Sequence, residues 1–203
     1  MEPLEWQYWK EGKLVAGLDE AGRGPLAGPV VVACVVFPPF TQPFLDRDSK
    51  KLSPAKREYL FEKIVRRAMS VTVAFAGPRE IEAYNIYKAT RKAYYKALKL
   101  LPIKPDLVIT DYMPLKSWNG TVLSPPKADE KFFSVAAASI VAKVIRDKLM
   151  ELYGKRYPDY GFEKHKGYPT GEHIEAINTL GVLPIHRRNY KPVKEKLKKK
   201  GLF

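Results

Sequence analysis

Three acidic residues stand at the ends of apolar segments, where they could bind a metal ion. Asp19 and Glu20 end a segment that begins at Leu14, and Asp111 ends a buried segment that begins at Asp106. In open α/β sheets, ligands gather at the carboxyl ends of strands, so Asp19 and Asp111 meet if their strands are neighbours. Carboxylates so close together repel each other and take up protons unless a cation joins them. Oxygen-only ligands suit Mg²⁺ or Mn²⁺, so we expect a divalent metal site.

Asp129 is a fourth candidate ligand. It lies just before a long predicted helix at 132–157. An acidic residue at that place, beside Glu130, also suits a helix N-cap, and the spacing alone favours this structural role. The sequence leaves open whether Asp129 joins the other acids.

A glycine-rich turn, Gly22-Arg23-Gly24, follows the first two acids. It partly matches the P-loop and the dinucleotide-binding fingerprint, but both motifs need the loop to open a helix whose N-terminus holds the phosphate. Here the turn leads into an apolar, β-branched run at 29–37 that predicts a strand, so both interpretations fail. Glycines without Cβ atoms let backbone groups approach a ligand closely. The alternative is a plain hairpin turn with solvated acids, and spacing alone leaves both open.

A second candidate binding segment, at 160–173, mixes aromatic residues, Lys, Gly and Pro without periodicity and predicts an ordered loop. Its aromatic rings could stack on bases or sugars while its lysines position phosphates. The alternative is that Tyr160, Phe162 and Tyr168 hold the loop against the body of the protein. His165 and His173 match no common zinc spacing, so we expect them to be structural or to lie beside phosphates.

The charge of the chain favours a polyanionic partner. Its 203 residues carry 36 Lys and Arg against 22 Asp and Glu, a formal net charge of +14, and nucleic acid is the first candidate. The Lys-rich tail at 191–200 predicts a solvated helix that adds non-specific attraction to such a partner. Cys34 is the single cysteine, which excludes a disulfide framework, and no apolar run approaches the ~18 residues of a membrane span. With no signal peptide at the N-terminus, we expect a cytoplasmic protein that does not bind membranes.

Strands and helices alternate along the chain, which predicts an α/β fold with a mostly helical C-terminal quarter. We expect a core at 1–150 and a small C-terminal helical subdomain at 151–203. Ser53 and Thr170 predict helix N-caps, and one helix breaks near Asn85. The predicted strands lie at 14–19, 29–37, 70–76 and 106–111, and the predicted helices follow Ser53, span 77–101 and 132–157, follow Thr170 as far as Gly181, and span 191–200.

Together these segments resemble the ribonuclease HII family. The resemblance covers roughly residues 14–192, nearly the whole chain. Each piece alone is weak, but several in the same order are very specific. They are GLDEAGRGPLAGPVV at 17–31, DSKKLS at 48–53, the acid-terminated strand at 106–111, KADEKFFSVAAASIVAKVIRD at 127–147 and YGFEKHKGYPT at 160–170. Ribonuclease HIII, the near relative, lacks the Gly-Arg-Gly signature, which favours type HII.

The resemblance implies a ribonuclease H-like core with a mixed, partly parallel sheet flanked by helices. It implies endonucleolytic cleavage of RNA in RNA–DNA hybrids and cutting 5′ of ribonucleotides embedded in duplex DNA. The metal-binding acids would be Asp19, Glu20, Asp111 and Asp129. The Gly22-Arg23-Gly24 turn would read the ribose 2′-OH, and Tyr168 would stack at the ribose–deoxyribose junction. We also predict substrate contacts for Lys50, Lys143 and Arg146.

The family chemistry sets the expected mechanism. Two divalent ions, Mg²⁺ or Mn²⁺, would activate a water and stabilise the leaving oxygen, giving 3′-OH and 5′-phosphate ends. Asp19 would bridge the ions, and the other three acids would complete their ligand shells. This chain has Tyr112 after Asp111 and Ala128 before Asp129, where family members often have glycine, and neither departure removes an acid.

Two other function classes stay open at this point. One is a basic nucleic-acid-binding module that does not cut, and the other is a small-molecule phosphohydrolase that uses the same acids. A duplex binder should lose affinity steeply as salt rises, whereas a small-molecule enzyme should not. The tail is a candidate docking segment for a replication or repair protein, and we expect a monomer.

Overall fold

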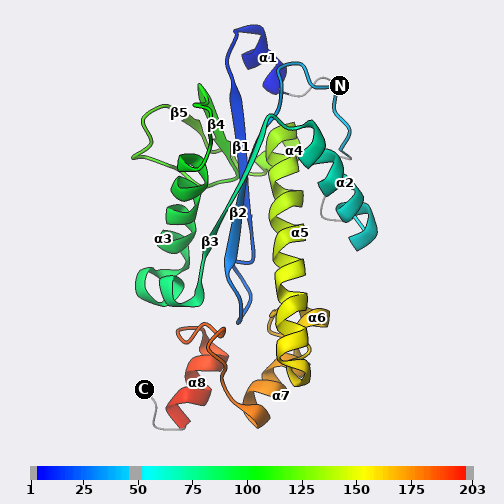
Figure 1. Ribbon diagram of the computed structural model, residues 1–203. Helices are drawn as coiled ribbons and strands as arrows, with labels where there is room; N and C mark the ends of the chain where they lie inside the picture. The colour runs from blue at the N-terminus through cyan, green and yellow to red at the C-terminus, as the bar shows by residue number, and fades with distance from the viewer. Residues whose placement is uncertain (1–3, 46–51, 200–203) are drawn as a thin grey trace. The chain divides into compact units, whose positions relative to one another are not determined.

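The computed structural model describes residues 4–45 and 52–199. It contains a five-stranded sheet with the order β3-β2-β1-β4-β5 (Figure 1). β1 pairs antiparallel with β2 and parallel with β4, and β4 pairs parallel with β5. The predicted mixed, partly parallel sheet is therefore confirmed. The strands are β1 (Val15–Ala21), β2 (Val30–Val36), β3 (Ser70–Ala76), β4 (Leu107–Thr110) and β5 (Thr121–Leu123).

The predicted helix signals are confirmed at three places. The Ser53 hydroxyl accepts a hydrogen bond from the Lys56 amide, and Thr170 caps α7 in the same way. Asn85 breaks α3 with a φ of 63°. The helices are α1 (Glu5–Lys10), α2 (Pro54–Arg67), α3 (Pro78–Lys99), α4 (Ala128–Lys131), α5 (Phe133–Arg156), the 3₁₀ helix η2 (Pro158–Tyr160), α6 (Phe162–His165), α7 (Gly171–Leu180) and α8 (Lys191–Lys199). Among the described residues, no helix is both long and apolar enough to cross a membrane.

The chain divides into two compact units. One comprises residues 1–21, 31–74 and 91–144, and the other comprises 22–30, 75–90 and 145–203. The four predicted acids belong to the first unit. The glycine turn, Arg146 and Tyr168 belong to the second, which gathers three stretches that are far apart in the sequence. The predicted domain division at residue 150 stays a prediction.

In the first unit, α5 lies very close to β1. A Cβ on Gly17 would lie 2.3 Å from the carbonyl carbon of Ser134, so only glycine fits at this position of the strand. The small residues that open α5, among them Ser134, allow this close approach of the two backbones. In β2, which pairs with β1, all seven residues are buried, as its unbroken apolar run predicts.

The start of α5 is capped from a distance by Glu5 of α1. The Glu5 carboxylate, fully buried, accepts hydrogen bonds from the Ser134 amide at 2.6 Å and from the Ser134 hydroxyl at 2.8 Å. This contact satisfies a backbone donor that the first turn of a helix leaves without a partner. Burial raises the pKa of Glu5 above its ordinary value. No sequence signal predicted this contact, because 129 positions separate the two residues.

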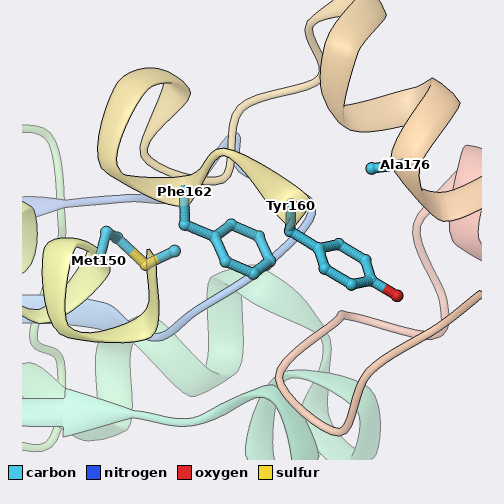
Figure 2. Close-up of a cluster of buried hydrophobic side chains, with 5 residues drawn as sticks. Met150, Tyr160, Phe162 and Ala176 are labelled. Carbon is cyan, nitrogen blue, oxygen red and sulfur yellow. The ribbon is translucent and has the colours of Figure 1, made fainter. Parts of the chain in front are cut away.

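The second unit has its own hydrophobic clusters. Tyr160 and Phe162 stack at 5.5 Å between ring centroids and pack with Met150 (Figure 2). Both rings therefore hold their segment in place, as one of the two predicted alternatives has it. The segment 160–173 is not a loop throughout, because it contains α6 and the start of α7.

The Lys-rich tail corrects another expectation. α8 is not solvated all round, since Val193 and Leu197 are buried against Leu26 and Ile177. Apolar residues four positions apart share one face of a helix, and this pair gives the lysine-rich segment a packing side. Three of its lysines, Lys191, Lys194 and Lys198, are exposed, and Lys196 is half-buried.

Candidate active site

Strand register brings Asp19 and Asp111 to the same edge of the sheet. β1 and β4 run parallel, and Leu18 lies opposite Thr110 in the last paired position. Asp19 directly follows Leu18, and Asp111 directly follows Thr110, so the two acids lie side by side on neighbouring strands. Their predicted meeting required these strands to be neighbours, and the sheet order confirms that condition.

Asp19 is the most deeply placed of these acids on the two strands. Its residue is 8% exposed, and its Oδ1 accepts a hydrogen bond from the Glu20 amide at 2.8 Å. Burial raises the pKa of Asp19 well above its ordinary value, and the charges of Glu20 and Asp111 raise it further. A hydrogen bond with Ser139 of α5 acts in the opposite direction. Asp19 therefore lies within electrostatic reach of both other acids, in surroundings that disfavour a lone negative charge.

Glu20, the next residue of β1, contacts α3. The hydroxyl of Tyr94, in α3, donates a hydrogen bond to Glu20 Oε2. Tyr94 is fully buried, and burial followed by the charges of Glu20 and Asp19 raises its pKa well above its ordinary value. Tyr94 is thus a neutral donor that fixes one carboxylate oxygen of Glu20. The sequence did not reveal this residue, because it has the spacing of any core aromatic in a helix.

Asp111 and Asp129 are linked through the backbone between them. The Ala128 amide donates a hydrogen bond to Asp111 Oδ1 at 2.9 Å, and Asp129 is the next residue, 5% exposed. The N-cap position of α4 belongs to Lys127, and Asp129 lies inside the first turn. The alternative interpretation of Asp129 as a helix N-cap is therefore wrong.

One of the two residues that stand where family members often have glycine keeps a glycine-like backbone. Tyr112, directly after Asp111, has a φ of 50°, in the left-handed region that glycine adopts readily and tyrosine rarely does. Ala128, before Asp129, is the first residue of α4, and the left-handed residue there is its N-cap Lys127, with a φ of 56°. The backbone that glycine would adopt is thus kept at Tyr112, whereas Ala128 is helical.

The four acids suit a divalent cation in their chemistry. All their ligand atoms are carboxylate oxygens, and the mutual repulsion that raises the pKa of Asp19 is what a bound cation would relieve. Within the part of the chain that the structure describes, no group of three or more Asp, Glu, His or Cys side chains is already closed tightly enough to hold an ion.

In the second unit, Arg187 holds the glycine turn through its backbone. Its guanidinium donates to the carbonyls of Gly22 at 2.6 Å, Arg23 at 2.8 Å and Gly28 at 3.0 Å. The side chain is fully buried, and the Tyr190 hydroxyl also donates to the Arg23 carbonyl, at 2.7 Å. A turn with so many fixed carbonyls is a rigid backbone surface, which favours the binding interpretation over that of a plain hairpin turn.

Tyr168 lies next to this turn. A Cβ on Gly24 would lie 3.7 Å from the Tyr168 ring, and the Arg146 guanidinium lies 5.8 Å from the ring centroid. The Tyr168 residue is 42% exposed, so its ring is open to a partner. The turn and the aromatic residue that the resemblance assigned to one junction are therefore neighbours.

The predicted basic contacts differ in their surroundings. Arg146 is 1% exposed and donates to the carbonyls of Pro29, Ala27 and Lys166, at 3.0–3.2 Å, so its side chain is bound to backbone. Lys143 is half-buried in α5. Lys50 lies outside the described residues. A role of these three in binding phosphate stays a prediction.

All three histidines of the chain form one buried cluster in the second unit. The rings of His165 and His173 stack at 4.4 Å. His186 Nδ1 accepts a hydrogen bond from the Leu183 amide, so its Nε2 donates to His173 Nε2 at 3.1 Å. His173 Nδ1 then donates to the carbonyl of Tyr168 at 2.9 Å. The cluster thus fixes the backbone of Tyr168.

Burial lowers the pKa of His173 to about 4 and that of His186 to about 3. Both rings are therefore neutral at pH 7, as their hydrogen bonds require. The structural interpretation of His165 and His173 is confirmed. His186 was not predicted to join them, because nothing in its local sequence points to the other two.

Comparison with known proteins decides the family. The chain matches the family Ribonuclease HII over residues 16–193. It is 51% identical over 191 residues to Ribonuclease HII of a Thermus thermophilus strain, with 94% of this chain and 93% of the relative covered. The chain belongs to the ribonuclease HII family. As a ribonuclease HII it is an endoribonuclease that acts on the RNA of RNA–DNA hybrids.

Solved ribonuclease H2 structures agree with the observed fold. The crystal structure of ribonuclease H2 from Pyrococcus horikoshii OT3 superposes with a TM-score of 0.77 at 30% identity, covering 92% of this chain and 98% of that one. The structure of the PCNA:RNase HII complex from Archaeoglobus fulgidus gives a TM-score of 0.71 at 29% identity, covering 88% and 94%. The expected ribonuclease H-like core of this ribonuclease HII is thus confirmed.

Proposed function

We propose that this ribonuclease HII also cuts 5′ of single ribonucleotides embedded in duplex DNA, and that it leaves 3′-OH and 5′-phosphate ends. The observation that carries the proposal is the pairing of two features on one short segment. Asp19 and Glu20 bring the carboxylates, and Gly22-Arg23-Gly24 follows within two residues, with the Gly22 and Arg23 carbonyls fixed. Only Ala21 separates the acids from the turn in the sequence.

The acids would bind the metal. Asp19 would contact both ions, and Glu20, Asp111 and Asp129 would complete the ligand set. Two divalent ions, Mg²⁺ or Mn²⁺, would supply an activated water and a stabilised leaving oxygen when bound. The raised pKa of Asp19 supports this proposal. Burial and the charges of Glu20 and Asp111 disfavour the negative charge of Asp19, and a bound cation would stabilise it.

The turn would select ribose. The 2′-OH is the group that distinguishes a ribonucleotide from a deoxyribonucleotide at a given site, and backbone groups can bind it whatever the base. Arg187 and Tyr190 keep the turn in one conformation, so the cost of ordering it is met on folding rather than on binding. The Tyr168 ring would stack on the neighbouring sugar or base.

The proposed function extends to a protein partner. A relative of similar fold is described in a complex with PCNA. We propose that a replication or repair protein of that clamp type docks on the C-terminal segment of this chain. A monomer in the cytoplasm that serves ribonucleotide excision repair is consistent with this role.

Single-turnover cleavage tests the proposal. The substrates are an RNA–DNA hybrid and a DNA duplex with one ribonucleotide, each with Mg²⁺ and then with EDTA. We expect both to be cut with Mg²⁺, the second at the 5′ side of the ribonucleotide, and neither with EDTA. Binding of the single-ribonucleotide duplex without cutting would refute the proposed junction activity.

A further inference from the structure

Tyr112 stands out as an exposed aromatic side chain beside a catalytic carboxylate. It directly follows Asp111, and at 72% exposure it is the most exposed large apolar residue of the described chain. Its φ is 50°, in the left-handed region, where a Cβ atom crowds the backbone. Burial of an apolar ring stabilises a fold, and exposure of one does not. Folding alone therefore gives no reason for an aromatic residue here.

Phe40 shows what an aromatic residue with such a backbone does when it serves the fold. Its φ is 62°, and its ring packs against Trp6 at 5.8 Å and Trp9 at 6.2 Å. The Tyr112 side chain has no hydrogen bond, ring contact or ion pair within residues 4–45 and 52–199. No hydrogen bond, ring contact or ion pair of this side chain among the described residues thus offsets the strained backbone.

The backbone around Tyr112 is held firmly. Thr110 and Met113 on either side are fully buried, and the Thr110 hydroxyl donates to the Met113 carbonyl at 2.8 Å. The Tyr112 amide donates to the Pro125 carbonyl at 3.3 Å. The ring therefore starts from a fixed point, one residue from Asp111, and strain that its surroundings over-determine is typical of functional sites.

We propose that the Tyr112 ring packs against a sugar or base of the bound nucleic acid, next to the scissile phosphate. The proposal rests on the proposed function, because it takes Asp111 to act at that phosphate. An aromatic face contacts any nucleotide without reading its base, which suits an enzyme that must cut in every sequence. The ring carries no charge, so its contribution to affinity does not depend on salt, unlike that of lysine contacts.

Three substitutions separate the ring from the backbone. Tyr112→Phe keeps the ring, whereas Tyr112→Gly and Tyr112→Asn remove it and tolerate the left-handed backbone. We expect the Phe variant to stay within about twofold of the wild type. For the Gly and Asn variants, Kd for a fluorescent RNA–DNA hybrid in EDTA and KM in Mg²⁺ should both rise about fivefold or more, the low end of base–aromatic stacking. The slope of log Kd against log salt should stay that of the wild type.

Stability and a matched control complete the test. The Gly and Asn variants should melt no lower than the wild type, so weaker binding cannot be blamed on unfolding. Tyr59→Ala, which removes an exposed ring from α2, should change neither Kd nor KM. Unchanged Kd and KM in the Gly and Asn variants would overturn the proposal. A loss confined to kcat would also overturn it, because it would mean that Tyr112 acts through Asp111 and not through contact with the nucleic acid. If the wild type binds the hybrid but does not cut it, the proposed function fails, while the Kd measurement still decides the role of Tyr112.

Discussion

Replacement of Arg187 by methionine tests whether a buried guanidinium holds the glycine turn. Methionine fills similar space without the five donors. The carbonyls of Gly22 and Gly28 would lose the donor that Arg187 supplies, whereas the Arg23 carbonyl would keep the Tyr190 hydroxyl. The substitution therefore separates the charge-assisted hydrogen bonds from the packing of the side chain.

The expected loss follows from those two carbonyls. A buried acceptor left without its partner costs about 1–3 kcal/mol, so the pair costs about 2–6 kcal/mol. Removal of a buried charge without a carboxylate partner offsets part of this. We expect the free energy of unfolding to fall by about 2–4 kcal/mol, a large share of the ~5–15 kcal/mol of a typical domain.

Urea denaturation followed by circular dichroism measures this loss. The neighbouring Arg188 is exposed, so Arg188→Met is a matched control that should change stability by less than ~0.5 kcal/mol. Below the unfolding transition, Arg187→Met should also lower cleavage of a single-ribonucleotide duplex more than cleavage of a long hybrid. Equal stability of the two methionine variants would refute the role of Arg187.

Two further predictions concern packing and protonation. Gly17→Ala should destabilise the protein by about 1–3 kcal/mol or prevent folding, because its Cβ would meet the Ser134 backbone at 2.3 Å. The control Gly77→Ala has open space around the new Cβ and should be neutral in the same urea assay. Similar stability of the two variants would contradict the tight packing of α5 on β1. The pKa is lowered to about 4 in His173 and to about 3 in His186, so as pH falls below about 6.5 these imidazoles become protonated in the unfolded chain before they do in the folded protein. The contribution of the cluster to stability is therefore lost as pH falls from about 6.5 toward 4. NMR titration of the three imidazoles in the folded protein should show at least two that stay neutral at pH 5, and two that titrate near 6.5 would contradict the buried network.

Local sequence signals predicted most of the elements. Ser53, Thr170 and Asn85 act within one helical turn, so their roles could be read without the rest of the chain. The meeting of Asp19 and Asp111 needed one long-range fact, the adjacency of β1 and β4. The general rule for ligands at strand ends supplied the expectation, and the sheet order confirmed it.

The residues that support the candidate site were not predictable in this way. Glu5 caps a helix 129 positions away, and Arg187 binds the Gly28 carbonyl 159 positions away. In a chain of net charge +14, a single arginine is indistinguishable from the many that face solvent. Buried arginines that serve backbone carbonyls therefore look, in sequence, like contacts for a polyanion. For the same reason the apolar face of α8 was hidden among its lysines.

The most direct test of the central claim, that acids from neighbouring strands form one catalytic site, is single-turnover cleavage of an RNA–DNA hybrid by Asp19→Asn at saturating enzyme. Asparagine keeps the shape of the side chain and removes the charge that Glu20 and Asp111 oppose, so the fold should persist. We expect the cleavage rate in Mg²⁺ to fall on the order of a thousandfold or more, while hybrid affinity in EDTA stays within about twofold. A near-normal cleavage rate, or a loss of affinity as large as the loss of rate, would contradict the account.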